Sequence, residues 1–177
     1  MSGLPNKNAQ FNAQNASQPY GTNHAPTLAN ELDEATDAEE KLLASVLLDP
    51  VLIHETKKKT PLQAFSDYKY NARNGNEYGN RARVYSAMLE CEHPDMITLA
   101  KQMVNMGIRH NGDIAYINSL IGNCATHLDW AFYCQAVNTY YARRMVVYYT
   151  NKGQLDKAQA ILQRVNNPVN SKYRGCD

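Results

Sequence analysis

The sequence predicts an all-α protein: a small helical body of about five to six helices, followed by a C-terminal antiparallel helical hairpin. Two observations support this fold class. Apolar residues recur at helical spacing in several separate segments between residues 36 and 165. Nowhere do Val, Ile and Thr alternate strictly with polar residues, as they do in a half-buried strand.

Length and charge limit the classes of protein that fit. The 177 residues are enough for one ordinary domain and a tail. The formal net charge is +1, so any contact with nucleic acid has to come from a local basic patch.

The four cysteines fit neither a CxxC metal site nor a dense disulfide framework, and we expect free thiols. No apolar run is long enough to span a membrane, so we expect a soluble, cytoplasmic protein.

The chain divides by composition. Residues 1–31 are rich in Asn and Gln and bury too little apolar surface to offset chain entropy, so we expect a disordered polar tail. A helical domain is expected over 32–150 and a returning hairpin helix over 151–166. Residues 167–177 are polar, and we expect them to form a flexible end.

The first predicted helix lies in "TDAEEKLLASVLLDP", residues 36–50. Thr36 followed by Glu39 is a capping-box pattern, which predicts that the helix begins at Thr36. Asp49 and the proline after it suit the start of a short helical continuation through Ile53. The apolar face of the first helix consists of Leu42, Leu43, Val46 and Leu47.

A long polar connection is predicted over residues 56–80, with at most one helical turn around residues 62–65. It is the most basic part of the chain and also contains tyrosines, a combination that suits phosphates and unpaired bases. We expect either a solvated loop or a loop that contacts nucleic acid. The candidate contacts are Lys57, Lys58, Lys59, Lys69 and Arg73.

Three shorter helices are predicted after this connection, because the helical period returns. The first begins at Arg81 and ends before Pro94. Asp95 caps the second, and Gly107 ends it in the left-handed conformation. The third ends at Gly122.

The longest predicted helix runs from Leu128 to about Thr150. At the usual rise per residue it would reach roughly 33 Å, further than a body of this size needs, so we expect its end to project. A turn at residues 151–153 precedes a second amphipathic helix, and the two predict an antiparallel hairpin.

Tyrosine and arginine side chains form a stripe on this long helix. Large side chains at helical spacing can pack within the hairpin, form an interface with a subunit or partner, or stack on bases. Tyr and Arg are enriched at interface hot spots, so the stripe is the candidate partner interface. Its members are Tyr140, Tyr141, Arg143, Arg144 and Tyr148.

The sequence contains no catalytic or metal-binding motif that we recognise. A nucleotide-hydrolysing site needs a GxxxxGK[ST] loop to hold phosphates, and none occurs. The five histidines show neither HExxH nor paired Cys/His spacing. His54 beside Glu55 does not form a base and its orienting carboxylate, because adjacent residues of a helix point in different directions. We therefore expect no ATPase or other catalytic activity, no cofactor and no metal.

Five strings, in order, resemble the N-terminal domain of DnaB-type replicative DNA helicases. They are "DAEEKLLASVLLDPVLI", "RARVYSAMLE", "PDMITLAKQMVNMG", "NGDIAYINSL" and "LDWAFYCQAVNTYYARRMVV". The resemblance covers residues 33–150. Arg81 stands where that family usually has His, Asp129 where it has Asn, and Cys134 where it has Ala.

The resemblance implies a helical body with a helical hairpin, the element through which that family pairs subunits to build the collar of a hexameric ring. It also implies homo-oligomers and docking of a primase or helicase loader in the primosome. From the charge of the chain we expect contact with DNA to be weak or indirect. In that family an ATPase follows this domain, so the chain is expected to be either the front part of an ATP-dependent helicase or a stand-alone relative. A stand-alone relative could act as a regulator that captures a helicase or primase by mimicking this domain.

Overall fold

The computed structural model describes residues 28–71, 75–107, 113–124 and 126–166. Helices dominate this part of the chain, which confirms the predicted fold class. The α-helices are α1 (Leu28–Leu48), α2 (Ile53–Lys59), α3 (Asn80–Leu89), α4 (Met96–Asn105), α5 (Asp113–Gly122), α6 (Trp130–Asn151) and α7 (Leu155–Asn166). Two short 3-10 helices, Pro50–Leu52 and Leu62–Ala64, and two strands, β1 (Tyr68–Asn71) and β2 (Gly75–Tyr78), complete it.

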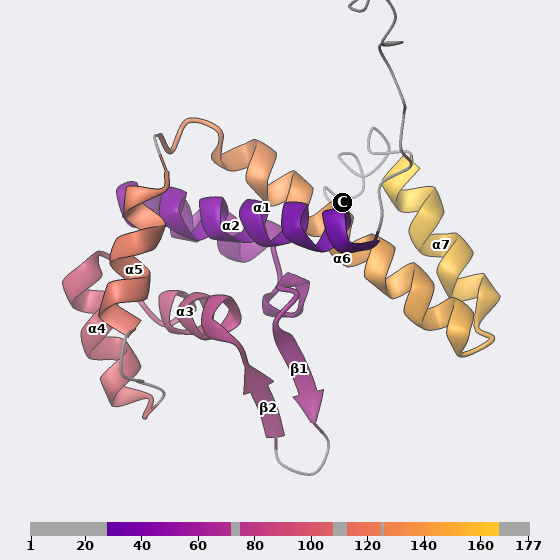
Figure 1. The fold of residues 1–177 in the computed structure, drawn as a ribbon, viewed down its shortest axis with the longest axis horizontal. Helices are drawn as coiled ribbons and strands as arrows, with labels where there is room; N and C mark the ends of the chain where they lie inside the picture. The colour runs from indigo at the N-terminus through magenta and orange to yellow at the C-terminus, as the bar shows by residue number, and fades with distance from the viewer. Residues whose placement is uncertain (1–27, 72–74, 108–112, 125, 167–177) are drawn as a thin grey trace, which may run out of the picture.

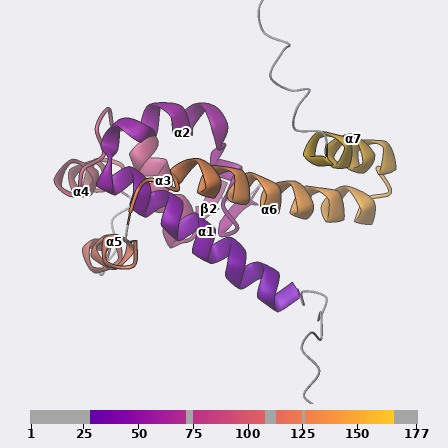
Figure 2. The same ribbon diagram turned by 90° about the horizontal axis from the view of Figure 1, so that it is seen from above.

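Helix α1 is the centre of the body. It packs along α6 on one side and contacts α5 and α3 on others, while α4 and α5 form one end of the molecule (Figure 1). Figure 2 shows that the C-terminal half of α6 continues past the body and that α7 lies beside it. The predicted hairpin is therefore present, and Gly153 closes its turn with a φ of 68°.

The core forms where the apolar faces of α1, α3, α4, α5 and α6 meet. The predicted α1 face is fully buried, and the Phe65 and Tyr85 rings stack beneath it with centroids 4.6 Å apart. Each buried side chain of this size contributes about 1.5–3 kcal/mol relative to its exposed state. The Tyr85 hydroxyl donates a 2.7 Å hydrogen bond to the Thr60 carbonyl oxygen, so burial of the ring leaves no orphan polar group there.

Several predicted helix boundaries are confirmed. The Asp49 side chain accepts a hydrogen bond from the Val51 N–H at the start of the first 3-10 helix. The Asp95 carboxylate accepts from the Ile97 and Thr98 N–H groups at the start of α4. Gly107 has a φ of 65° just past the end of α4.

The predicted start of α1 is wrong. Helix α1 begins at Leu28, so residues 28–31 of the predicted polar tail are helical, and the rest of that tail lies outside the described residues. The first turns of α1 pack against α6, where Ala35 and Ala38 are buried. Thr36 is inside the helix and does not cap it. The predicted flexible end, 167–177, also lies outside the described residues.

The predicted connection over 56–80 contains a β-hairpin that the sequence did not indicate. Strands β1 and β2 pair antiparallel, with Tyr68 opposite Tyr78, and project from the body (Figure 1). Asp67 fixes the base of this hairpin. Its carboxylate accepts hydrogen bonds from the Arg81 and Ala82 N–H groups, so a residue before the hairpin caps α3 after it. The predicted turn around 62–65 is confirmed as the second 3-10 helix.

Candidate protein-interaction surface

All five residues of the predicted partner interface lie on α6, but the structure gives them different roles. Tyr140 and Arg143 face the N-terminal half of α1. The Tyr140 hydroxyl donates a 2.7 Å hydrogen bond to Glu34, and this bond raises the pKa of Tyr140. An Arg143 guanidinium nitrogen lies 3.5 Å from a Glu31 carboxylate oxygen, and the guanidinium carbon lies 5.6 Å from the Tyr140 ring centroid.

Arg144 makes its contacts within the fold. Its guanidinium donates to the Ala64 carbonyl oxygen and lies 3.9 Å from the Glu39 carboxylate. Burial lowers its pKa, although the negative charge of Glu39 opposes this effect. Arg144 therefore ties the second 3-10 helix to α6. Its place in an intermolecular interface stays a prediction, as does that of Tyr141, which packs partly buried against the core.

Glu39 is the residue whose role the sequence missed. Its side chain is 1% exposed and accepts hydrogen bonds from the Ser66 N–H at 2.7 Å, the Ser66 hydroxyl at 3.0 Å and the Arg81 Nε at 2.8 Å. Burial raises the pKa of Glu39 against these favourable contacts. The spacing of Glu39 from Leu43 and Val46 places it on the apolar face of α1, and this spacing was the available signal.

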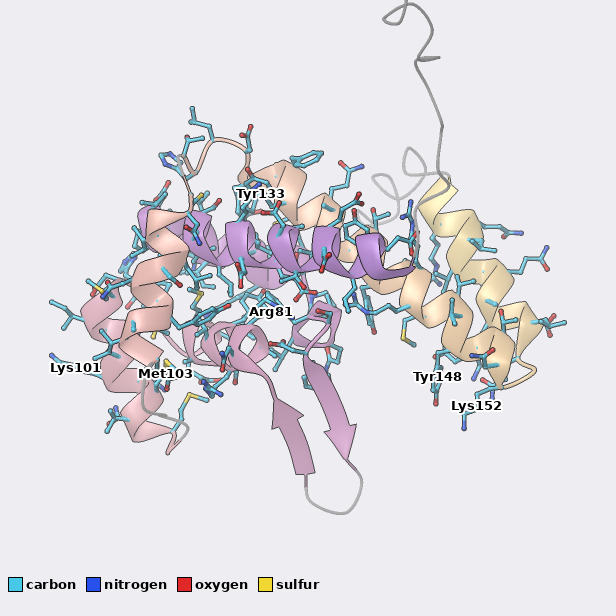
Figure 3. The ribbon with its side chains drawn as sticks, in the orientation of Figure 1. Arg81, Lys101, Met103, Tyr133, Tyr148 and Lys152 are labelled. Carbon is cyan, nitrogen blue, oxygen red and sulfur yellow. The ribbon has the colours of Figure 1, made fainter. Side chains whose placement is uncertain are left out.

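The projecting end of the hairpin carries a group of exposed apolar side chains. On α7, only Ala158 is buried among the described residues, while Leu155 is 63% and Leu162 46% exposed. On α6, Val147 is 58% and Tyr148 52% exposed. Figure 3 shows Tyr148 and Lys152 together at this end, where the Lys152 ammonium lies 5.8 Å from the Tyr148 ring centroid.

An apolar groove of about 260 Å³ runs between the N-terminal half of α1 and the C-terminal half of α6. Leu32, Ala35 and Val147 supply most of its apolar lining, and Tyr140 and the two arginines border it. The groove therefore connects three of the predicted interface residues with the exposed part of the hairpin. It has the mixed aromatic, Arg and aliphatic composition that is typical of protein interfaces.

The three lysines of the predicted nucleic-acid contact come together in the last turn of α2, and all are exposed. Each also has a contact within the chain. Lys57 donates to a main-chain carbonyl at 3.4 Å, Lys58 lies 2.7 Å from the Glu55 carboxylate, and the Lys59 ammonium lies 4.5 Å from the Trp130 ring centroid. Their contact with nucleic acid stays a prediction.

The other two predicted contacts do not join this cluster. Lys69 lies in β1, opposite Glu77 in the strand register, and Arg73 lies outside the described residues. Among the described residues, no group of three or more His, Cys, Asp or Glu side chains could hold a metal ion. Over the same residues, no helix combines the length and the hydropathy of a membrane span.

These features together define a helical body with a protruding hairpin. The fold is similar to the crystal structure of the N-terminal domain of DnaB helicase from Mycobacterium tuberculosis, with a TM-score of 0.53 and 23% sequence identity. The match covers 72% of this chain and 96% of that chain. No protein-family model and no curated protein sequence matches the chain. The resemblance predicted from the five strings is thus confirmed as a likeness of fold.

Proposed function

We propose that this chain is a non-catalytic assembly and docking domain that acts in DNA replication. In this role it self-associates through the α6–α7 hairpin, and it binds a primase or helicase loader through the remaining helix faces. The likeness of fold to a helicase N-terminal domain supports the proposal. The order of the five sequence strings, which resemble the same domain, also supports it.

The single observation that carries the proposal is the uncovered hairpin. Helix α7 has a marked apolar side, yet Leu155 and Leu162 remain about half exposed beside the buried Ala158. Several exposed apolar side chains gathered on a projecting hairpin are typical of a surface that another protein covers. A second copy of the same hairpin presents the same surface, which makes a symmetric pair the simplest cover.

The size of this surface sets the expected affinity. Complete burial of one such side chain contributes about 1.5–3 kcal/mol, and roughly half of that remains to be gained at each of the four exposed hairpin residues. A symmetric pair doubles the gain to about 6–12 kcal/mol, against an association cost of about 4–15 kcal/mol. Self-association through this patch alone should therefore be weak, with a Kd of about 1 μM at the most favourable end of these ranges, and it should depend on protein concentration.

Sedimentation velocity over a micromolar concentration series tests the proposal. We expect the wild-type chain to associate and the double variant Leu155→Ser/Leu162→Ser to sediment as a monomer. The matched control is Ile97→Ser, which alters a side chain that is 67% exposed on α4 at the opposite end of the molecule. Circular dichroism checks that the variants keep their helix content.

A wild-type chain that stays monomeric at high micromolar concentration and shows no affinity for primase would refute the proposal. A different result would favour the alternative function, that of a stand-alone regulator. In that case the chain would bind the N-terminal domain of another helicase, or a primase, more tightly than it binds a second copy of itself.

A further inference from the structure

A second cleft lies on the other part of the α1–α6 seam, towards the N-terminus of α6. It has a volume of about 560 Å³. Glu34, Asp37 and Lys41 line it from α1, and Asp129, Phe132 and Tyr133 line it from the start of α6. Figure 3 shows Tyr133 at this position above α1, far along the molecule from Tyr148 and the hairpin end.

The cleft is acidic. Its lining holds three carboxylates and one ammonium group, which leaves two net negative charges. The ammonium group of Lys41 is already paired, because it lies 2.8 Å from the Asp37 carboxylate in the same helix. An adjoining hollow between α1 and α5 extends the acidic lining with Glu40. A partner that fills the cleft must therefore supply positive charge.

The cleft also offers an apolar and aromatic anchor point. Phe132 is 66% exposed, and its ring makes an edge-to-face contact with Tyr133, with ring centroids 5.8 Å apart. Leu128, just before α6, is 80% exposed. Exposed large side chains beside a cleft are typical of binding sites, and the exposed Phe132 ring can also accept a cation, as the Tyr133 ring does from Lys41 at 6.0 Å.

A second copy of this chain fits the cleft poorly. The only cluster of three consecutive basic residues in the described part of the chain is Lys57–Lys59. Each of these lysines has a contact of its own, with a main-chain carbonyl, a carboxylate or an indole ring. Docking them elsewhere would break those contacts. A partner segment whose Lys or Arg side chains are exposed in its free state can enter the cleft without breaking such contacts.

We propose that the acidic cleft between α1 and α6 binds a cationic amphipathic helix of a partner protein, with the partner's Lys or Arg side chains meeting Glu34 and Asp129 and an apolar side chain packing on Phe132. Helix-in-groove docking of this kind uses apolar anchors at helical spacing for affinity and charge for orientation. The assignment rests on the proposed docking role and gives that role a site and a partner chemistry. It is separate from the hairpin surface proposed for self-association.

Fluorescence anisotropy with the full chain and a labelled synthetic peptide tests the assignment. The probe is a peptide of roughly 15 residues in which Leu and Lys repeat at helical spacing, so that it forms about four turns. We expect it to bind the wild-type chain more weakly as salt is raised from about 50 to about 300 mM. The same peptide with Glu in place of every Lys should not bind.

The decisive variant is Asp129→Asn/Phe132→Ala, which should weaken peptide binding about tenfold or more. Both side chains are exposed, and Asp129 makes no side-chain capping bond to α6, so the variant should keep its fold. The matched control is Glu92→Gln/Ile97→Ala, which removes one exposed acid and one exposed apolar side chain away from the cleft. This control should bind as the wild type does.

Equal loss of binding in both variants, or equal binding of the Lys and Glu peptides, would overturn the assignment. So would a shift of the sedimentation equilibrium towards monomer in the Asp129→Asn/Phe132→Ala variant, because a second copy would then occupy the cleft. Monomeric behaviour of the wild type together with specific peptide binding would instead refute only the proposed self-association.

Discussion

Removal of Arg81 should destabilise this protein more than removal of any exposed arginine. Its Nε lies 2.8 Å from the Glu39 carboxylate, which is 1% exposed, and its own side chain is 17% exposed. Arg81→Ala leaves that buried carboxylate with the two hydrogen bonds from Ser66 and with the Arg144 guanidinium 3.9 Å away. Loss of one partner of a buried ion pair typically costs about 3–5 kcal/mol, and the remaining Arg144 should keep the cost near the lower end of that range.

The loss of unfolding free energy in Arg81→Ala should depend on pH. The burial of Glu39 determines whether this loss grows or shrinks as pH rises. Burial already raises the pKa of Glu39 above its value in the unfolded chain, and loss of the arginine raises it further. A group whose folded-state pKa is raised favours the folded state most below the unfolded pKa, and this advantage is lost as pH rises through the folded pKa. The destabilisation by Arg81→Ala should therefore be largest near neutral pH and smaller near pH 5.

Urea unfolding followed by circular dichroism at a fixed protein concentration measures both effects. Arg143→Ala is the matched control, since its 3.5 Å ion pair with Glu31 is more than half exposed on the arginine side and should contribute less than about 1 kcal/mol. Glu39→Gln combined with Arg81→Ala should recover part of the loss. An Arg81→Ala cost no larger than that of Arg143→Ala, or one that does not change with pH, would show that the buried pair is not a stabilising element.

Four further predictions concern single positions. Gly79→Ala should cost about 1–2 kcal/mol of unfolding free energy, because a Cβ would lie 2.4 Å from Asp67 Oδ2 and displace the carboxylate that caps α3. Gly122→Ala, which meets open space, should be neutral or stabilising by up to about 1 kcal/mol in the same urea assay. Tyr85→Phe should cost about 1–2 kcal/mol through loss of its buried hydrogen bond, and a thermal melt unchanged from wild type would contradict this. The Cys134 thiol is 2% exposed and burial raises its pKa, so mass spectrometry after maleimide treatment should find it unmodified until denaturant is added.

The sequence predicted those parts of the fold that depend on local chemistry. The caps at Asp49 and Asp95 and the left-handed Gly107 are confirmed because each is determined by residues within one helical turn. The hairpin of α6 and α7 is confirmed for a similar reason, since its length and turn are encoded in one continuous stretch. The fold class follows from the repetition of these local signals.

Features that depend on distant contacts could not be predicted. The true start of α1 depends on contacts between Ala35, Ala38 and α6, which lies about 100 residues away in the chain. Glu39 fits a capping box by sequence, but in the structure it pairs with Arg81 and Ser66. The local pattern favours a capping role for Glu39, whereas the tertiary structure offers it Arg81 and Ser66 as partners. In this fold Glu39 takes the tertiary partners.

The β-hairpin was missed for a different reason. Its strands are four residues long and mostly polar, so they lack the alternating apolar pattern that identifies a half-buried strand. A two-stranded hairpin is marginal by itself. Here Asp67 closes its base by bonding to the first turn of α3, and the Tyr68 side chain packs partly against the core. These long-range contacts stabilise the β-hairpin, which the strand sequences alone would not do.

The candidate site was predicted as one stripe on the long helix, whereas our two proposals place binding at two separate parts of α6. Phe132 and Tyr148 are 16 positions apart, which corresponds to roughly 24 Å of helix. The anchor residues of the two proposed surfaces are therefore well separated along α6, and the surfaces meet only at Tyr140. If the two surfaces act independently, Leu155→Ser/Leu162→Ser should abolish self-association and leave binding of the Lys peptide unchanged. Asp129→Asn/Phe132→Ala should show the reverse pattern. A loss of both activities in either variant would mean that the two surfaces are coupled, and Tyr140, which lines both the acidic cleft and the apolar groove beside the hairpin, is the side chain that joins them.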